Sequence, residues 1–403
     1  MKCRSTGQEI PVIHSFGMQP IANGFLDNPK IENEYFFKMD VAINPENALF
    51  QLVNQPDPNK MFHENYAFFS RTSNFMINHF KSVAEEILNL TNQNNLSGEK
   101  FIIEVGSNDG VMLEHIVNNN VSCLGIEPSK NVALESQKYG VKTINEFLSI
   151  DTADLVIRDY GLADVVYAAN VFCHIPNIND LAESCNKLLK DKGYLIFEDP
   201  YLLDVLKKTS YDQIYDEHVY LFSNTSVEEV FKKYDLILVD CHPLNTHGGS
   251  MRYYLQKNTD NTKSPNLQAA LSDEENFGIR SLSTYEKFSQ NCELSKELFR
   301  EKLLSANKAG QKVVGYGATS KSTTILNYCE IGPDLIQFIT DTTPTKINKF
   351  TPGMHIPVLD YTNFHPYPDL GVLFAWNHKE EILQKESSFI ESGGKFITHL
   401  LDN

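Results

Sequence analysis

Residues 101–118 read FIIEVGSNDGVMLEHIVN, and this stretch predicts the fold of the central part of the chain. Its first five residues form an apolar run of strand length, Gly106 and Gly110 stand in the turn that follows, and an amphipathic helix is expected from residue 111. Further apolar runs at SCLGIE, VVYAAN and GYLIFEDP alternate with helical patterns at 111–118, 129–139 and 179–190. Such alternation indicates an α/β fold with a parallel, doubly wound sheet.

The pattern changes on both sides of this central part, which predicts three domains. Residues 1–75 are rich in Pro, Asn and aromatic side chains in short alternating runs, so we expect a small irregular or β-rich domain. Residues 76–257 are expected to form the central Rossmann-type domain. A polar break at 256–265 leads into a helical stretch of about 266–309 that Gly278 interrupts, and the strand-like runs VVGYG and GVLFAW follow. Residues 258–403 are therefore expected to form a smaller, Rossmann-like α/β domain.

The charge of the chain argues against two kinds of partner. Among 403 residues, 35 are Lys or Arg and 52 are Asp or Glu, which gives a net charge of −17. A field of this sign repels phosphate backbones and anionic lipid, so neither nucleic acid nor a membrane is an expected partner. The seven cysteines contain no C-x-x-C pair and there is no apolar h-region or spanning run, which favours reduced thiols, no metal site and a cytoplasmic location. The number of subunits stays open.

The first glycine loop favours S-adenosylmethionine over NAD as its ligand. NAD-binding loops usually read G-x-G-x-x-G, whereas here an acid, Glu104, precedes a G-x-x-x-G spacing. Asn108 and Asp109 would crowd or repel a pyrophosphate, and Glu104 can engage the ammonium group of an amino acid moiety. Glu127, at the end of the next strand, can accept both hydroxyls of an adenosine ribose. A chance glycine pair in a tight turn is the alternative for the loop alone. The expected cofactor residues are Glu104, Gly106, Asn108, Gly110, Glu127 and Asn170.

A second group of residues is suited to acid–base chemistry. His174 comes just after the strand VVYAAN, and IYDEHVYLFS supplies Tyr215, Glu217, His218 and Tyr220. Tyr66, in HENYAFFS, adds a phenol from the first domain. A histidine beside a carboxylate and phenols can remove a carbon-bound proton and stabilise the enolate that forms. Taken singly, each of these side chains fits packing or surface roles equally well.

Two later motifs leave alternatives open. The first is THGGSMR, residues 246–252, which contains Arg252. It fits a loop that approaches an anion or a cofactor, and it fits a hairpin or strand-entry loop equally well. VVGYGATSKSTT places Gly317 before a helix with Lys321 near its start. A helix N-terminus with one lysine suits a diphosphate, although a second NAD site or a solvated lysine explains the motif as well. Trp376 fits packing or ligand stacking.

In their order, these motifs resemble those of the S-adenosylmethionine-dependent C-methyltransferases of deoxysugar nucleotide biosynthesis. The resemblance spans nearly the whole chain and is carried by EVGSNDG, GIEPS, NVFCHIPN, YDEH, THGGS-x-R, GYGA-x-x-K, PGMHIPVL and AWN. It implies a central cofactor-binding domain and a C-terminal domain that helps to hold a nucleoside-diphosphate sugar. It also implies that a 4-keto sugar is deprotonated and methylated at C3.

Carried over motif by motif, the resemblance assigns roles to particular residues. Its active-site positions fall on Tyr66, His174, Tyr215, Glu217 and His218, with His218 as the expected base. We expect Glu217 either to orient the imidazole of His218 or to balance its charge. The residues expected to bind the nucleotide sugar are Lys321, Gly317, Arg252 and Tyr220, with Lys346 and His355 as weaker candidates.

The N-terminal domain departs from the family. Members usually carry two C-x-x-C pairs there that bind a structural zinc ion, whereas this chain has Cys3 with Thr6, then Asn44 and Asn47. With three of four thiolates missing, a closed tetrahedral zinc site is not expected. Three other functions stay as alternatives: a sugar O- or N-methyltransferase, an NAD-dependent nucleotide-sugar oxidoreductase, and a non-catalytic partner with the same fold.

Overall fold

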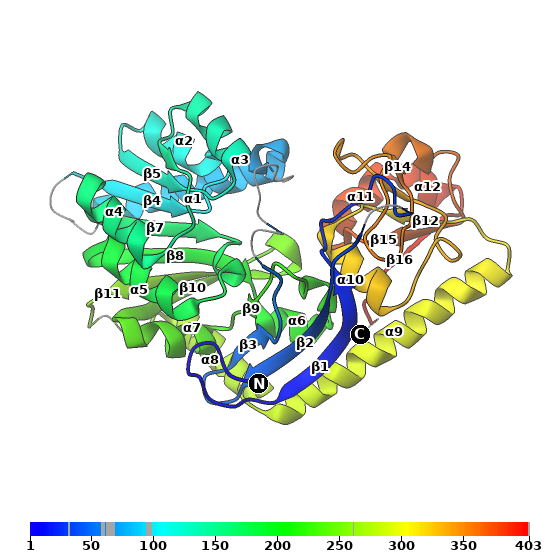
Figure 1. Ribbon diagram of the computed structural model, residues 1–403, viewed down its shortest axis with the longest axis horizontal. Coiled ribbons are helices and arrows are strands. Elements are labelled where there is room, and N and C mark those ends of the chain that lie inside the picture. The colour runs from blue at the N-terminus through cyan, green and yellow to red at the C-terminus, as the bar shows by residue number, and fades with distance from the viewer. Residues whose placement is uncertain (31–32, 58–60, 62–68, 94–98, 261, 402–403) are drawn as a thin grey trace.

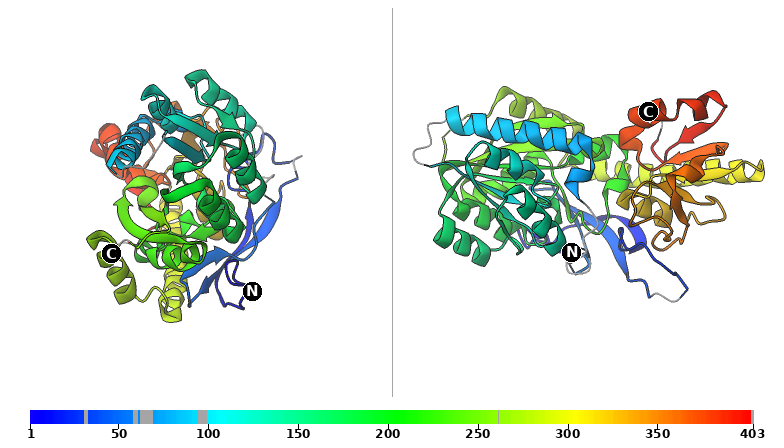
Figure 2. Two further views of the ribbon diagram at one scale, coloured as in Figure 1. Left: turned by 90° about the vertical axis from the view of Figure 1, so that its left-hand side faces the viewer. Right: turned by 90° about the horizontal axis from the view of Figure 1, so that it is seen from above.

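The computed structural model describes residues 1–30, 33–57, 61, 69–93, 99–260 and 262–401. Within these residues the chain forms three β-sheets with helices around two of them (Figure 1). Seen from above, the two α/β units lie at opposite ends of the molecule and the N-terminal sheet lies beside their junction (Figure 2). The predicted α/β class, with a small N-terminal β unit and two Rossmann-like units, is confirmed.

The first sheet is antiparallel and joins distant parts of the chain. Its order is β1 (Val12–Pro20), β2 (Phe36–Asn44), β3 (Leu49–Leu52) and β9 (Tyr220–Leu221). Phe50 and Gln51 of β3 pair with Leu221 and Tyr220 of β9. This pairing fixes the segment that carries His218 against the N-terminal unit.

The four positions that bear zinc ligands in the family lie together and are joined by hydrogen bonds. Asn47 Nδ2 donates to Ser5 Oγ at 2.9 Å, and Cys3 Sγ lies 3.3 Å from the same oxygen. Asn44 Nδ2 donates to Thr6 Oγ1 at 3.4 Å. Burial raises the pKa of the Cys3 thiol, but hydrogen bonds from Ser5, Thr6 and Asn44 outweigh it and leave that pKa lowered. The local contacts at these four positions are therefore hydrogen bonds between polar side chains.

The second sheet is the seven-stranded core of the central unit, in the order β10-β11-β8-β7-β4-β5-β6. The five neighbouring strands β8, β7, β4, β5 and β6 are parallel to one another. Strand β11 runs antiparallel to both β8 and β10. Their bounds are β4 (Phe101–Val105), β5 (Ser122–Ile126), β6 (Thr143–Ile144), β7 (Ala163–Ala169), β8 (Leu189–Pro200), β10 (Leu236–Leu244) and β11 (Ser250–Lys257).

Helices cover both faces of this sheet because successive strand residues point to opposite sides. Ile102 packs with α1 (Asn74–Gln93) and α2 (Val111–Asn118). Ile103, its neighbour, packs with α4 (Ile150–Tyr160), α5 (Ile178–Leu188) and α7 (Asn224–Phe231). Short helices α3 (Lys130–Ser136) and α6 (Leu202–Lys208) follow β5 and β8.

The third sheet is parallel throughout, in the order β14-β13-β12-β15-β16. Its strands are β12 (Val313–Tyr316), β13 (Ile339–Asp341), β14 (Val358–Asp360), β15 (Leu370–Leu373) and β16 (Lys395–Ile397). Its helices are α10 (Ser320–Tyr328), α11 (Lys379–Lys385) and α12 (Ser387–Glu391).

Two helices link the α/β units. The expected helical stretch is divided where predicted, because α8 (Pro265–Phe277) ends at Gly278 in a left-handed conformation and α9 (Leu282–Lys308) follows. Apolar residues of α9 share a core with the first sheet and the C-terminal unit (Figure 1). The proposed boundary at 75 falls inside α1 and the one at 257 follows β11, so the three-domain division stays a prediction. No helix in the described ranges has the length and apolar character to cross a bilayer.

Candidate active site

The carboxyl group of Glu104 is buried at the end of β4 and lacks a complete set of partners. Its Oε2 has no hydrogen-bond partner among the described residues. Burial, with Asp109, Glu127 and Glu198 nearby, raises the pKa of this carboxyl well above its usual value. An unsatisfied buried carboxyl is unfavourable, and a ligand ammonium group would both pair with it and favour its ionised form. The site therefore fits the amino acid moiety of S-adenosylmethionine.

Glu127 connects the turns that follow β4 and β5. Its Oε2 accepts a hydrogen bond from the backbone N–H of Asn108 at 3.0 Å, and its Oε1 accepts one from Ser129 at 2.7 Å. Burial raises the pKa of this carboxyl as well. In the first turn Gly106 has φ of +67°, and a Cβ there would lie 2.3 Å from Val171. Only glycine fits this close approach of two strand ends.

Two polar side chains of the loop contact the segment before α1. Asn108 Oδ1 accepts from the N–H of Ser70 at 3.0 Å, and Asp109 Oδ2 accepts from that of Arg71 at 2.9 Å. The 3-10 turn η2 (Ser70–Thr72) therefore lies next to the loop. A cofactor contact of the Asn108 side chain stays a prediction. Asn170 follows β7, and its Nδ2 lies 2.6 Å from His247 Nε2.

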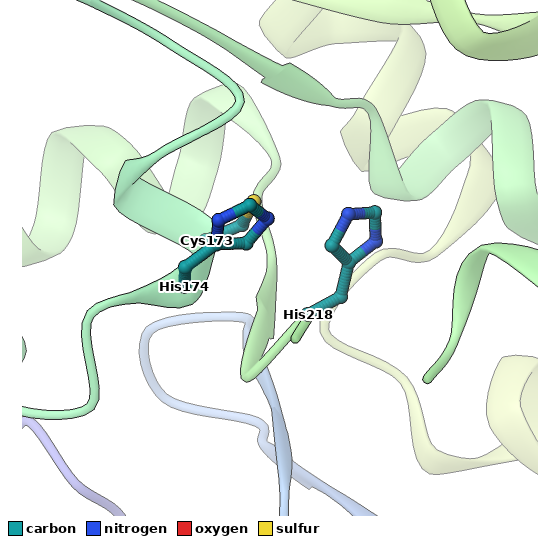
Figure 3. Close-up of side chains that lie close together, drawn as sticks. All are labelled: Cys173, His174 and His218. Carbon is teal, nitrogen blue, oxygen red and sulfur yellow. The ribbon is translucent and has the colours of Figure 1, made fainter. Parts of the chain in front are cut away.

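His174 and His218 form a stacked pair, with ring centroids 5.3 Å apart and planes 20° apart (Figure 3). His174 ends the turn η4 (Phe172–His174) just after β7, as predicted for a strand-end residue. Burial lowers the pKa of His174 to about 3. Burial, then the neighbouring His174, His247 and Lys321, lowers the pKa of His218 well below its usual value. Both rings are therefore neutral at physiological pH.

The hydrogen bonds of His218 define its tautomer. Its Nδ1 lies 2.7 Å from the carbonyl oxygen of Gln213, and because a carbonyl only accepts, Nδ1 carries the proton. Its Nε2 therefore has the lone pair and accepts from the Tyr215 hydroxyl at 2.8 Å. The ring is held with a basic nitrogen next to a phenol.

Glu217 does not supply this orientation. Its Oε1 accepts from Asn23 Nδ2 at 2.8 Å, which turns the carboxyl toward the N-terminal segment. Burial raises its pKa to about 6, with Asn23 and Lys346 acting in the opposite direction. The hydrogen bond that orients His218 at Nδ1 therefore comes from the Gln213 carbonyl, and a charge-balancing role of Glu217 stays a prediction.

Lys321 is buried where the C-terminal unit meets the central one. Its Nζ donates to the carbonyl of His247 at 3.2 Å and lies 5.7 Å from the Trp376 ring. Burial lowers its pKa to about 8, although Asp212 favours the charged form. Gly317, in the turn before α10, has φ of +88°. Trp376 Nε1 donates to Asp212 Oδ2 at 2.6 Å, so Trp376 has a structural partner.

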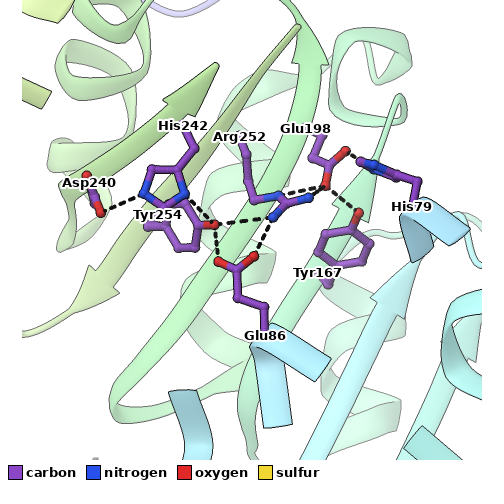
Figure 4. Close-up of polar contacts among 8 residues, drawn as sticks. All are labelled: His79, Glu86, Tyr167, Glu198, Asp240, His242, Arg252 and Tyr254. Atoms are coloured by element: carbon purple, nitrogen blue, oxygen red, sulfur yellow. Dashed lines mark hydrogen bonds and ion pairs between the residues drawn. The ribbon is translucent and has the colours of Figure 1, made fainter. Parts of the chain in front are cut away.

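Arg252 is engaged by two carboxyl groups (Figure 4), and its role in binding substrate stays a prediction. Its Nε and Nη2 each lie 2.8 Å from Glu198 Oε1, and its Nη1 also contacts Glu86. Glu198 further accepts from Tyr167 at 2.9 Å and lies 2.7 Å from His79. The cation is therefore neutralised within the protein.

Tyr220 also has a partner within the protein. It is fully buried on β9, and its hydroxyl donates to the carbonyl of Pro176 at 2.7 Å. This places it in the contact between the first sheet and the central unit, and its role in binding substrate stays a prediction. Tyr66 lies outside the described residues.

Several site residues were missed by the sequence prediction. His247 bonds Asn170 and receives Lys321, Gln213 holds His218, and Asp212 holds Trp376. Asp212 and Gln213 lie in the turn η5 (Tyr211–Gln213), immediately upstream of YDEH. The polar pair Asp212–Gln213 between the tyrosines Tyr211 and Tyr215 was the available signal.

Comparison with known proteins identifies the class. Residues 75–240 match the model of a methyltransferase domain, and residues 245–400 match that of the C-methyltransferase C-terminal domain. The chain is 30% identical over 404 aligned positions to the C-methyltransferase NovU of Streptomyces niveus, covering 98% of this chain and 94% of that protein. The chain therefore belongs to the C-methyltransferase family: it is a methyltransferase whose cofactor is S-adenosylmethionine, as predicted.

Other similarities cover less of the chain. The ubiquinone biosynthesis O-methyltransferase of Acinetobacter baumannii strain AYE is 23% identical over 184 residues, which is 41% of this chain and 75% of that protein. A crystal structure of magnesium protoporphyrin IX methyltransferase from Synechocystis PCC 6803 with bound SAH shares 13% identity at a TM-score of 0.36, over 45% of this chain and 84% of that one. The family assignment rests on the match along the whole chain.

Proposed function

We propose that the protein methylates C3 of a nucleoside-diphosphate 4-keto-deoxysugar and that His218 is the base. Methylation at carbon first needs the removal of a proton from that carbon, and a keto group at C4 makes the neighbouring proton acidic. The observation that carries the proposal is the arrangement Gln213–His218–Tyr215, which presents a neutral imidazole with its lone pair on Nε2. The resemblance to deoxysugar C-methyltransferases supports the substrate class.

In this proposal the C3–H bond breaks, its proton goes to His218 Nε2, and the electron pair passes to the C4 oxygen as an enolate. Tyr215, at 2.8 Å from that nitrogen, is placed to turn its hydroxyl toward the enolate oxygen as the proton arrives. The ring of His174 lies beside that of His218, with centroids 5.3 Å apart (Figure 3). When bound, the cofactor supplies an electrophilic methyl group.

Binding of the two ligands is divided between the units. Glu104 and Glu127 are proposed to hold the ammonium and ribose of the cofactor. Gly106 and Gly110 let the loop between them pack tightly, because a Cβ would lie 2.3 Å from Val171 at the first and 2.9 Å from Ser136 at the second. Lys321 and the turn at Gly317 are proposed to hold the diphosphate, because this buried lysine lies near both His218 and His247. Because the net charge of the chain, −17, repels a diphosphate, a local cation such as Lys321 is needed to bind one.

The test is hydrogen exchange without methyl transfer. In heavy water, the wild-type protein with a nucleotide 4-keto sugar and S-adenosylhomocysteine should introduce deuterium at C3, because proton removal does not need the methyl donor. His218→Asn should abolish exchange and turnover while cofactor affinity is unchanged, since Asn cannot take up the proton. Tyr215→Phe, which keeps the ring and removes the hydroxyl, should slow both.

Glu217→Gln is the matched control, because Glu217 is adjacent to His218 but makes no contact with its ring nitrogens. It should slow exchange less than either variant. Turnover to an O-methyl product without C3 exchange would contradict C-methylation, and NMR of the product identifies the atom that carries the methyl group. Exchange that persists in His218→Asn would remove His218 as the base.

A further inference from the structure

Cys173, His174 and His218 bring a thiol and two imidazoles together beside β7 (Figure 3). One ligand atom of each residue lies within 4.8 Å of those of the other two. Thiolate and neutral imidazole are the ligand types that Zn²⁺ prefers, at bond lengths of about 2.0–2.3 Å. Small movements of side chains would therefore suffice to bring all three ligands onto one ion.

A fourth group makes the cluster favourable for a cation. Asp199, at the end of β8, is fully buried, and its Oδ2 accepts from the N–H of Cys173 at 3.1 Å. Its Oδ1 has no hydrogen-bond partner in the described part of the chain. Burial raises the pKa of this carboxyl to about 8, so it gives up its proton when a divalent ion binds and then balances the charge of that ion.

We propose that Cys173, His174 and His218 form an inhibitory binding site for Zn²⁺ or a similar borderline-soft divalent cation. On binding, the Cys173 thiol loses its proton to solvent and a metal–sulfur bond forms, while each imidazole donates one lone pair. This cluster is separate from Cys3, Thr6, Asn44 and Asn47, the positions where the family carries its structural zinc.

The inhibitory effect follows from the tautomer of His218. Because Nδ1 donates its proton to Gln213, Nε2 is the nitrogen able to bind a metal. The metal would displace the Tyr215 hydroxyl and take the lone pair that the base needs. This consequence rests on the proposed function, whereas metal binding itself does not.

Binding is tested by calorimetric titration of chelator-treated full-length protein with zinc chloride. Wild type should bind one equivalent, and Cys173→Ser and His174→Asn should each weaken that binding at least tenfold. Cys3→Ser is the matched control and should bind like wild type. With Co²⁺, wild type and Cys3→Ser should show a thiolate-to-cobalt charge-transfer absorption that Cys173→Ser lacks. Mg²⁺, which prefers oxygen ligands, should not compete.

Inhibition is measured as the rate of each variant with one equivalent of Zn²⁺ relative to its own metal-free rate. Wild type and Cys3→Ser should be inhibited, and Cys173→Ser much less. Absence of stoichiometric binding, or binding lost in Cys3→Ser and kept in Cys173→Ser and His174→Asn, would overturn the site. Binding at the cluster with undiminished turnover would overturn the inhibition. Failure of C3 exchange in metal-free wild type would contradict only the proposed function, since calorimetry does not depend on it.

Discussion

At the scale of single residues, Glu127 combines a structural and a ligand-binding role. It already accepts two backbone N–H groups, from Asn108 and Ser129, and it is expected to accept the ribose hydroxyls as well. Glu127→Ala should weaken cofactor binding by about 1.5–3 kcal/mol, the range for hydrogen bonds to a charged group. Calorimetry with S-adenosylmethionine measures this.

Glu135→Ala is the control for that variant, because Glu135, near the end of α3, pairs with the exposed Lys138 just after that helix and should leave affinity unaltered. Equal affinity in wild type and Glu127→Ala would refute the ribose assignment. A melting curve of each variant shows whether the turn itself has been disturbed.

Lys321 gives a pH-dependent prediction. Burial lowers its pKa to about 8, so the amine is charged below that pH and neutral above it. If Lys321 binds the diphosphate, affinity for a nucleoside diphosphate should fall as pH rises through about 8, and Lys321→Met should bind weakly with little pH dependence. Trp376, the only tryptophan, lies 5.7 Å from Nζ, so its fluorescence can report binding.

Lys308→Met, at the exposed end of α9, should keep both the affinity and the pH profile of wild type. A wild-type affinity that stays level between pH 7 and 9 would show that Lys321 is not the diphosphate ligand.

At the scale of elements, the ion pair between β8 and β11 should dominate the stability of the central sheet. Arg252 and Glu198 lie opposite each other in the strand register, and both are buried. Arg252→Met would leave the Glu198 carboxylate without its cation, which typically costs about 3–5 kcal/mol. Urea denaturation of wild type and variant should show this loss at neutral pH.

The pH dependence of that loss has a definite sign. Burial opposes ionisation of Glu198, but His79 and Arg252 outweigh it and lower its pKa in the folded protein. Its contribution is therefore full above the unfolded pKa of about 4.3 and is lost as pH falls through the folded value. The double variant Arg252→Met, Glu198→Gln should be more stable than Arg252→Met alone. If Arg252→Met proved as stable as wild type at neutral pH, the ion pair would not have the stabilising role described.

Elements with a local signal could be predicted from sequence, and those made by distant pairing could not. A few consecutive residues are enough to recognise the apolar runs of β4, β5, β7 and β8 and the glycine after α8. The two residues of β9 form a strand only because they pair with Phe50 and Gln51. The pairing of Arg252 with Glu198 could not be predicted for the same reason, since strand register brings the two residues together.

At the scale of the whole molecule, the turn η7 (Thr246–Gly248) joins the cofactor end of the sheet to the C-terminal unit. The carbonyl of His247 receives both Lys321 and the side chain of Gln213, while its ring contacts Asn170. Asp212 holds Trp376 and also lies 3.1 Å from His399 near the end of the described chain. The residues proposed for cofactor, base and diphosphate are therefore connected through one interface.

Gly248 tests this connection, because it lies against Trp376 of the other unit. Its φ is +87°, and a Cβ there would lie 2.3 Å from Cη2 of the indole. Gly161 has φ of +91°, and no atom of the described residues lies within 4 Å of such a Cβ, so Gly161→Ala carries the backbone strain of roughly 1–3 kcal/mol without the clash. Gly248→Ala should lower the melting temperature further than Gly161→Ala. It should also shift the Trp376 emission to longer wavelength and weaken nucleoside-diphosphate binding, because the indole must leave its place above Lys321. If the two variants behave alike in all three measurements, strain alone explains the effect and the interface does not position the diphosphate site.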